Sequence, residues 1–352
     1  MRAGSWSAKA TSHGAAVRLI VVGGVDAAVT SSVFVEDWGA AYGSAYLIAA
    51  DEVDSGTGQP VEDGEGHLER HVPQVPIDRS VAFVDGVRRG EASLYLKVGD
   101  KLARGIAGAH GRGSVVVTPG ERPEFDSCTV ERLVLWGGGE AAPLPDIEGG
   151  WSWRPASIAS DEPDAPLQEL QRRMREAEGR LAEDLCARGH LTIVDGPLNF
   201  VRSRDLPVVG YVKTHYRPLL PPELHERVPE LLAGERTSLI AARADVYTSY
   251  LRLAEPSRAA GPWSGIVRLE VPSSPGLTAA VETIDSVAAS LPRFAGVPHV
   301  DPRAPQNLQP IGALEQHLRH LLGDIGLAIR AVRSSVDQLH QPPPDTQGKD
   351  HP

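Results

Sequence analysis

Residues 81–86 read Val-Ala-Phe-Val-Asp-Gly, and residues 191–196 read Leu-Thr-Ile-Val-Asp-Gly. The β-branched and aromatic residues of each run predict a buried strand, and the glycine is expected to end it. Asp85 and Asp195 then stand where the backbone leaves the sheet. If the two strands are neighbours, the carboxylates meet at one open edge, and like charges so close favour a divalent cation between them. The pattern therefore predicts a metal site, although Asp-Gly is also a common turn sequence.

The composition is typical of a globular protein that can bury one large core or two modest ones, since 41% of the 352 residues are hydrophobic. The formal net charge of −11 argues against a protein that coats nucleic acid by charge alone. Cys128 and Cys186 are the only cysteines and lack metal-ligand spacing, which excludes a zinc ribbon and a disulfide framework and suits the cytoplasm. No apolar run approaches the roughly 20 residues that span a membrane, so we expect a soluble protein.

The order of apolar patterns predicts a single α/β domain over residues 16–338, with disordered tails at 1–15 and 339–352. Strands are expected at 17–22, 81–84, 92–98, 114–118, 132–136, 191–195, 208–213, 238–242, 246–253 and 266–271. Helices are expected at 167–188, 278–294 and 311–338, the first ended by Gly189 and the last with a possible break at Gly323. Residues 51–70 and 137–166 are expected to be loops. These elements amount to a mixed sheet flanked by helices.

One glutamate of the predicted helix 167–188 falls on its apolar face. The apolar stripe recurs every three or four residues, at Leu167, Leu170, Met174, Ala177, Leu181 and Leu185. At about 100° per residue, Glu178 lies roughly 40° from Met174, inside the stripe, whereas Glu176 lies on the far side. A buried carboxylate needs compensation, and a metal shared with the two aspartates would supply it. The alternative is an ion pair with Arg175 or Arg173.

The order of these motifs resembles the NurA nuclease family. The matching stretches are residues 83–88, Glu178, residues 194–198 and residues 209–213, within a resemblance that covers roughly residues 80–271. It implies an RNase H-like fold and a nuclease dependent on Mn²⁺ (or Mg²⁺) that acts on DNA, with Asp85, Glu178 and Asp195 as metal ligands. It also implies a homodimer that works with a hexameric HerA-like ATPase in DNA end processing, repair or defence.

The chain departs from the family pattern at two places. Where the family's first motif reads Asp-Gly-Ser, this chain has Val87 after Gly86. Near the C-terminus the family carries a tyrosine and a histidine, and the corresponding stretch here, residues 305–315, contains neither. Asn307 and Glu315 fall at those places. Glu315 is therefore a candidate to replace the histidine as a catalytic metal ligand or water-orienting group.

Phosphodiester hydrolysis also needs cations that hold the phosphate and the nucleic-acid strand. Lys213, at the end of a predicted strand, is the first candidate for the scissile phosphate. Further candidates for nucleic-acid contacts are Arg88, Arg202, Arg204, His215 and Arg217. Arg202 and Arg204 share a polar turn, and a solvated loop is the alternative reading for both.

Two other classes of function remain open. A catalytically degenerate member of the same fold would serve as a DNA-binding adaptor for the ATPase. A purely structural α/β protein would pair Glu178 with arginine and bind no metal. The convergence of the Asp85, Asp195 and Glu178 carboxylates in a structure would separate these classes from a nuclease.

Overall fold

The computed structural model describes residues 31–35, 57–64, 66–213, 218–255 and 260–340. The strand expected at residues 17–22, the tail at 1–15 and all but two residues of the tail at 339–352 lie outside these ranges. His215 and Arg217 lie outside them as well.

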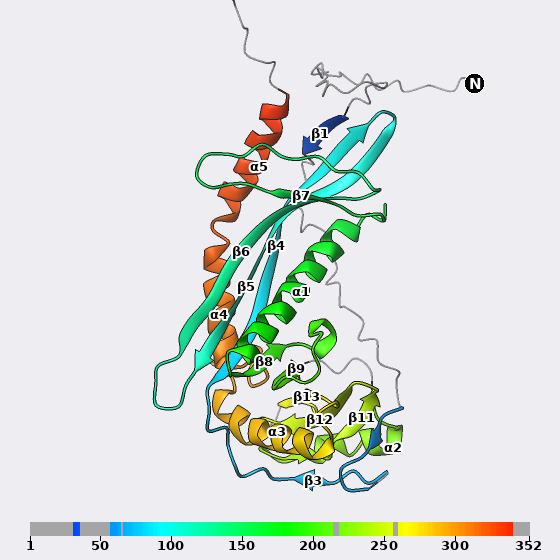
Figure 1. The fold of residues 1–352 in the computed structure, drawn as a ribbon, viewed down its shortest axis with the longest axis vertical. Helices are drawn as coiled ribbons and strands as arrows, with labels where there is room; N and C mark the ends of the chain where they lie inside the picture. The colour runs from blue at the N-terminus through cyan, green and yellow to red at the C-terminus, as the bar shows by residue number, and fades with distance from the viewer. Residues whose placement is uncertain (1–30, 36–56, 65, 214–217, 256–259, 341–352) are drawn as a thin grey trace, which may run out of the picture.

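The described chain forms a run of strands, a long helix, further strands and closing helices, in the order that the sequence predicts (Figure 1). The strands are β1 (Ser31–Val35), β2 (Gln59–Pro60), β3 (Arg70–His71), β4 (Val81–Val98), β5 (Lys101–Val117), β6 (Glu124–Trp136), β7 (Arg154–Ser157), β8 (Leu191–Asp195), β9 (Val208–Val212), β10 (Arg236–Thr237), β11 (Ile240–Arg243), β12 (Val246–Arg252) and β13 (Ile266–Pro272). The helices are α1 (Ala165–Ala187), α2 (Pro222–His225), α3 (Leu277–Ser290), α4 (Gln309–Leu321) and α5 (Ile325–Leu339), with short 3₁₀ turns η1 (Leu198–Phe200), η2 (Val228–Glu230) and η3 (Leu291–Phe294).

All the described strands join one 13-stranded mixed sheet, which confirms the predicted α/β class. Its main path runs β2-β11-β12-β13-β9-β8-β4-β5-β6-β7, while β1 adds to β4, and β10 links β12 to β3. The pairs β4–β8, β8–β9 and β6–β7 are parallel, and the remaining pairs are antiparallel. The strands expected to carry the two aspartates, β4 and β8, are therefore direct neighbours.

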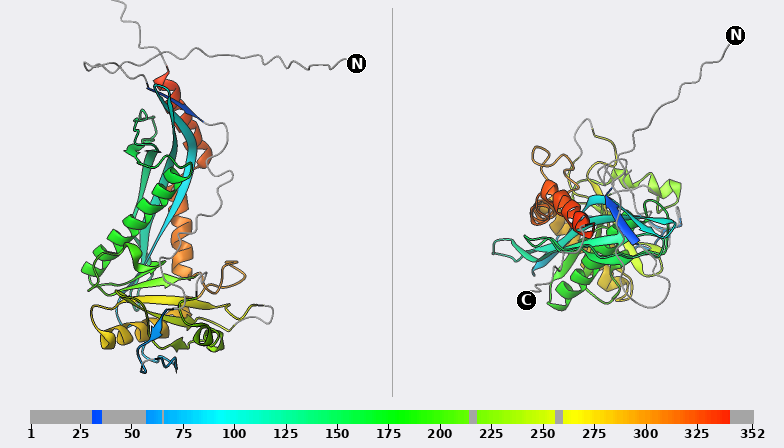
Figure 2. Two further views of the ribbon diagram at one scale, coloured as in Figure 1. Left: turned by 90° about the vertical axis from the view of Figure 1, so that its right-hand side faces the viewer. Right: turned by 90° about the horizontal axis from the view of Figure 1, so that it is seen from above.

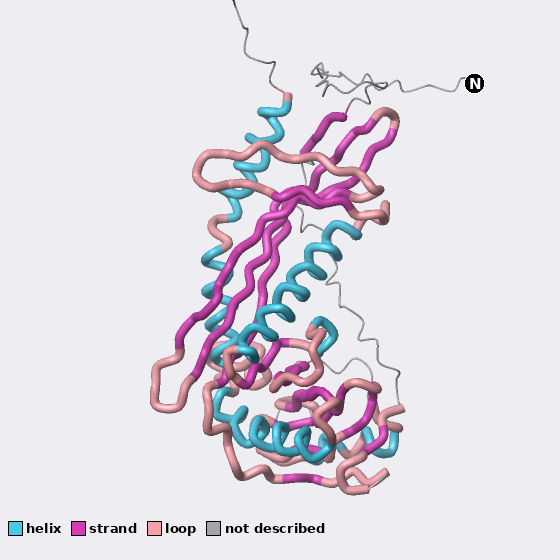
Figure 3. The backbone as a smooth tube through the Cα atoms, viewed as in Figure 1, coloured by secondary structure: helices cyan, strands magenta, loops and turns pink. Residues whose placement is uncertain are grey.

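Three long strands, β4, β5 and β6, form a ribbon that extends away from the rest of the sheet (Figure 3). The predicted strands 81–84 and 92–98 are in fact the two ends of β4, which has 18 residues. Likewise 114–118 and 132–136 are only the ends of β5 and β6. The prediction was too short because each strand carries polar residues, and β4 and β5 also carry glycines, which interrupt the apolar alternation but remain paired.

Helices cover both faces of this ribbon, with α1 on one face and α4 and α5 on the other (Figure 2). Successive residues of a strand project to opposite faces. On β4, Val84 packs with Leu181 of α1, whereas Val87 packs with Leu314 of α4. A bulge between Gly90 and Ala92 then shifts the alternation. This two-sided cover explains why a strand with polar residues stays buried.

The helix boundaries follow the predicted signals. Helix α1 begins beside Pro166, and Gly189 follows its end with φ +94°, a conformation that favours glycine. Gly323, with φ +73°, separates α4 from α5 and confirms the predicted break. The Asp324 side chain then caps α5 by accepting a hydrogen bond from the Leu327 amide at 2.8 Å.

Beyond the ribbon, the sheet continues through β8, β9, β13 and β12 and packs on α3 (Figure 1). Phe83 of β4 is fully buried there and makes an edge-to-face contact with Phe294, with ring centroids 5.0 Å apart. The loop predicted at 137–166 contains the short strand β7, which the prolines and glycines around it conceal. Across the described residues, every helix is too short or too polar to cross a bilayer.

Candidate metal centre

The register between β4 and β8 sets Asp85 beside Asp195. The two strands run parallel, with Val81 opposite Leu191 and Val84 opposite Val194. The next residue of each strand is an aspartate, and residues in register on parallel strands project to the same face. Asp85 is buried, and Asp195 is partly exposed. The sequence-based expectation that the two aspartates meet is therefore correct.

A third carboxylate joins them from α4. Oxygen atoms of Asp85, Asp195 and Glu315 all lie within 4.8 Å of one another. Glu315 lies on the buried face of α4 and is 7% exposed. The three residues come from two strands and a helix far apart in the sequence. This carboxylate cluster, Asp85, Asp195 and Glu315, has the spacing and the oxygen donors that suit a divalent cation.

Gly86 has a different role from the one the sequence suggests. It does not end the strand, because β4 continues for 12 more residues to Val98. Instead it provides space: a Cβ at this position would clash with Oε1 of Glu178 and approach Met174 Cγ to 2.9 Å. Gly196 does end its strand, with φ +122°. The two Asp-Gly motifs thus have separate physical causes.

Glu178 approaches from the α1 face. It is 1% exposed and is the only buried glutamate of α1, as its place in the apolar stripe predicts. Because Gly86 and Asp85 project to opposite faces, Glu178 lies on the other side of β4 from the carboxylate cluster. The expected convergence of Glu178 with both aspartates is therefore wrong at this point. Helical periodicity predicts burial, but it does not determine which face of the sheet the helix covers.

Arg175 neutralises part of the Glu178 charge, which is the pairing weighed as the alternative. Its Nη1 atom donates to Glu178 Oε2 at 2.8 Å and to the Asp195 carbonyl oxygen at 2.7 Å. The other oxygen of Glu178, Oε1, is buried and has no hydrogen-bond partner. Arg175 therefore links the glutamate to the end of β8, while one buried carboxylate oxygen stays unsatisfied.

Lys213 lies on the Asp195 side of the cluster. Its ammonium donates to Asp195 Oδ2 and to Asn307 Oδ1, both at 2.8 Å. Asn307 is buried, and its amide nitrogen donates to Asp301 Oδ2 at 2.5 Å. This chain of hydrogen bonds fixes the orientation of Lys213 toward the cluster. Lys213 thus lies beside the predicted metal site.

Glu315 is held by Arg303, which sequence analysis did not identify. Arg303 donates from Nη1 to Oε1 and from Nη2 to Oε2 of Glu315, each at 2.9 Å. It also contacts Asp301. Arg303 lies in the segment between η3 and α4, where no local pattern marks it. Only the folded chain shows that it meets the cluster.

The burial of acidic groups raises pKa values here. Burial is the largest cause that raises the pKa of Asp85 well above its ordinary value, followed by the charges of Asp195 and Glu178. Lys213 and Arg175 oppose the shift without cancelling it. Burial also raises the pKa of Glu178, although Arg175 counteracts it. Among the described residues, no lysine or arginine forms an ion pair with Asp85.

The other predicted nucleic-acid contacts are dispersed. Arg88 is half-buried and donates to Gln171 of α1. Arg204 is bound to Asp245 at 2.6 Å and to the Leu198 carbonyl at 3.0 Å, so it stabilises a loop instead of facing solvent freely. Arg202 is exposed. The exposure of Arg202 is compatible with both readings, and Arg204 anchors its loop.

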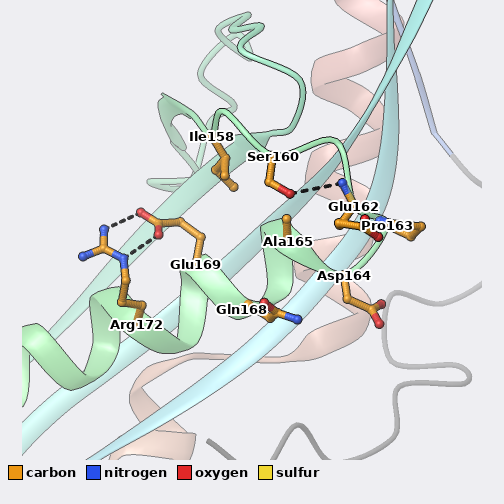
Figure 4. Close-up of a pocket in the computed structure, with 9 residues that line it drawn as sticks. All are labelled: Ile158, Ser160, Glu162, Pro163, Asp164, Ala165, Gln168, Glu169 and Arg172. Carbon is orange, nitrogen blue, oxygen red and sulfur yellow. Dashed lines mark hydrogen bonds and ion pairs between the residues drawn. The ribbon is translucent and has the colours of Figure 1, made fainter. Parts of the chain in front are cut away.

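The pocket drawn in Figure 4 lies elsewhere, at the start of α1. Its lining is acidic, with Glu162, Asp164 and Glu169, and Arg172 is bound to Glu169. It includes none of the clustered carboxylates. A negatively charged nucleic acid would be repelled there, so this pocket is not a substrate site for such a ligand.

The chain matches no known protein family and no curated protein. Among solved structures, the NurA nuclease from Sulfolobus solfataricus is similar to it, with a TM-score of 0.48 and 13% sequence identity. The match covers 77% of this chain and 88% of that chain. A likeness of this size establishes neither a family nor an activity, so the function must be argued from the site.

Proposed function

We propose that the protein is a divalent-metal-dependent nuclease that hydrolyses phosphodiester bonds in DNA. The observation that carries the proposal is the convergence of Asp85, Asp195 and Glu315, with oxygens within 4.8 Å of one another, beside the ammonium of Lys213. Three carboxylates this close repel one another, and a hard cation is the usual compensation. Mn²⁺ and Mg²⁺ both favour such oxygen ligands.

The residues present fit such a cation. Asp85 is buried without an ion-pair partner among the described residues. Asp85, Asp195 and Glu315 would hold the ion. When bound, a divalent cation supplies the Lewis acidity that activates water and stabilises the leaving oxygen of a phosphodiester.

Lys213 and Glu178 have supporting parts in this proposal. Lys213 is oriented by Asn307 and presents its ammonium beside Asp195, where it would pair with the scissile phosphate. Glu178, through Arg175, fixes the end of β8 and therefore the position of Asp195. An additional role of Glu178 as a metal ligand would require its free oxygen to reach the other face of β4.

The finer assignments rest on the motif resemblance to NurA nucleases. These are the RNase H-like character of the sheet, a preference for Mn²⁺, a homodimer, and docking on a hexameric HerA-like ATPase in DNA repair or defence. The net charge of −11 supports the need for such a partner, because an acidic chain binds the phosphate backbone weakly alone. Light scattering of the protein, and its co-elution with a hexameric HerA-like ATPase, would test the homodimer and the docking.

One observation favours a second candidate, the catalytically degenerate adaptor. Each of Asp195, Glu178 and Glu315 already has a cationic partner, respectively Lys213, Arg175 and Arg303. A site neutralised in this way could persist without a metal. The adaptor would bind DNA and the ATPase but would not cleave DNA in any divalent cation.

Digestion of end-labelled single-stranded DNA in MnCl₂, with and without chelator, tests the proposal. We expect cleavage that the chelator abolishes and that Asp195→Asn reduces by at least about 100-fold, since even residues that only support metal ligands cost 10–100-fold. Asp100→Asn is the control, because Asp100 is exposed in the turn after β4. DNA binding without cleavage in every metal would instead support the adaptor.

A further inference from the structure

The carboxylate of Glu315 faces an arginine on the solvent side of the site. Arg303 binds both of its oxygens in a bidentate pair, at 2.9 Å each. The Arg303 side chain is 50% exposed, whereas that of Glu315 is 10% exposed. The guanidinium is thus at the solvent side of the carboxylate cluster. The bidentate geometry strengthens this ion pair, but its exposure lets water screen it and lets another anion reach the guanidinium.

The segment that carries Arg303 is anchored on either side of the site. Asn307 accepts from Lys213, and the Gln306 carbonyl accepts from the Tyr211 hydroxyl at 2.6 Å. Asp301 accepts a hydrogen bond from the Arg303 amide at 2.8 Å. The backbone around Arg303 is therefore held in place. Rotation of the long side chain would move the guanidinium, and it would also break the 3.3 Å contacts to Asp301.

The balance of charge at the site changes if a cation binds. Without one, Lys213 and Arg303 compensate Asp195 and Glu315. A divalent cation shared by the carboxylate cluster would supply that compensation itself. The guanidinium would then lose most of its attraction to Glu315 but keep a geometry that pairs equally well with phosphate.

We propose that Arg303 is a phosphate-binding residue of this site. Glu315 holds Arg303 until a metal ion takes the place of the guanidinium on the Glu315 carboxylate. The inference rests on the proposed function and adds to it an exchange of partners. Metal binding releases Arg303 from the metal ligand Glu315, and the released guanidinium binds a phosphate of the DNA strand. Metal and DNA therefore favour each other's binding, because each removes a competitor of the other.

The exchange predicts opposite effects of one substitution on two affinities. In Arg303→Gln, Mn²⁺ should bind about threefold more tightly, because a competing exposed ion pair is removed. In saturating Ca²⁺, which takes the same oxygen ligands, the variant should bind a fluorescent single-stranded oligonucleotide about fivefold more weakly, because a phosphate contact is lost. Calorimetry with MnCl₂ measures the first affinity, and fluorescence polarisation, with the DNA shown intact on a gel, measures the second.

Arg319→Gln is the matched control. Arg319 also contacts Oε2 of Glu315, at 3.3 Å, but through one nitrogen only, and it is 65% exposed. The substitution Arg319→Gln removes the same charge as Arg303→Gln but leaves the bidentate pair intact. The affinities for Mn²⁺ and for the oligonucleotide should therefore both stay within about twofold of wild type. Equal effects of the two substitutions would reduce the exchange to a general charge effect and overturn the inference.

Two further outcomes separate the inference from the proposed function. If wild-type protein binds Mn²⁺ and Arg303→Gln binds it more weakly, Arg303 only positions Glu315 and the exchange is wrong, while the metal site stands. If wild-type protein binds no Mn²⁺, the proposed function fails and the exchange fails with it. Circular dichroism of each variant verifies that the fold is kept.

Discussion

Gly86 and Glu178 compete for the same space. A Cβ on Gly86 would clash with Oε1 of Glu178, a fully buried atom that has no hydrogen-bond partner. The glycine that follows Asp85 therefore serves the packing of α1 on β4. It allows a buried glutamate to lie against the strand directly behind the carboxylate cluster, where its charge raises the pKa of Asp85.

Substitution of Gly86 should uncouple β4 from α1. We expect Gly86→Ala to destabilise the protein by about 1–3 kcal/mol, the usual cost of excess volume in a packed core. Truncation in Glu178→Ala should recover part of that cost, although Met174 remains close. Urea denaturation of the single and double variants measures the coupling. Gly111→Ala, where the nearest neighbour of the added Cβ is at an ordinary 3.5 Å, is the control.

Asp85→Asn should stabilise the metal-free protein while removing metal binding. Because the folded state raises the pKa of Asp85 above 3.8, its contribution to stability is complete at pH values below that and is lost as the pH rises through the raised pKa. At neutral pH the wild type has therefore lost this stability, whereas the Asp85→Asn variant, which has no charge at this position, has not. We expect a melting temperature higher by about 1–2 °C in chelator, which corresponds to roughly 1 kcal/mol for a chain of this length.

The same variant should lose the stabilisation that Mn²⁺ gives to the wild type. Thermal scans of both proteins, with and without MnCl₂, supply the comparison. A wild-type melting temperature that does not respond to the metal, or a variant that responds equally, would contradict the assignment of Asp85 as a ligand.

Glu178→Gln should affect activity, and Glu176→Gln should not. Glu178 is 1% exposed and paired with Arg175, whereas Glu176 is partly exposed and pairs with Arg172 on the outer side of α1. Loss of the charge of Glu178 weakens the hold of Arg175 on the end of β8, so we expect cleavage to fall about 10–100-fold. Timed digestion of labelled DNA compares the two. Similar rates for both variants would remove Glu178 from the site.

The sequence predicts the parts of the site that depend on local patterns. Asp85 and Asp195 each follow a short apolar run, so their strands and their place in one sheet can be anticipated. The burial of Glu178 follows from the spacing of apolar residues along α1. Each of these predictions needs only a period of two or 3.6 residues.

The remainder depends on contacts between distant segments. Nothing near Arg303 indicates that it will meet Glu315, and nothing near Glu178 indicates which face of β4 the helix will cover. The full length of β4 is hidden as well, because Arg88 and Gly90 interrupt its apolar pattern. These residues remain in the strand since α1 and α4 cover both sides of it. Tertiary packing, which single-sequence patterns do not encode, decides such cases.

His110 should make the stability of the protein sensitive to mild acid. It is 2% exposed, and neither ring nitrogen has a hydrogen-bond partner, although Glu131 lies 3.3 Å away. Burial lowers its pKa below 6.5; Glu131 opposes this shift, and Arg112 and Arg173 add to it. The neutral ring is therefore the folded form.

A lowered histidine pKa contributes stability that is present above pH 6.5 and is lost as the pH falls through the folded value. In His110→Leu, which keeps an apolar side chain of similar size, this loss should disappear. We expect the free energy of unfolding of the wild type to fall by roughly 1 kcal/mol more than that of the variant between about pH 7 and pH 5. Urea denaturation across this range measures the slope, which does not depend on the absolute stability of the variant. His67→Asn, at an exposed position, is the control and should show the same pH slope as the wild type. If His110→Leu also has the wild-type slope, His110 takes up its proton without cost to the fold, and the prediction is wrong.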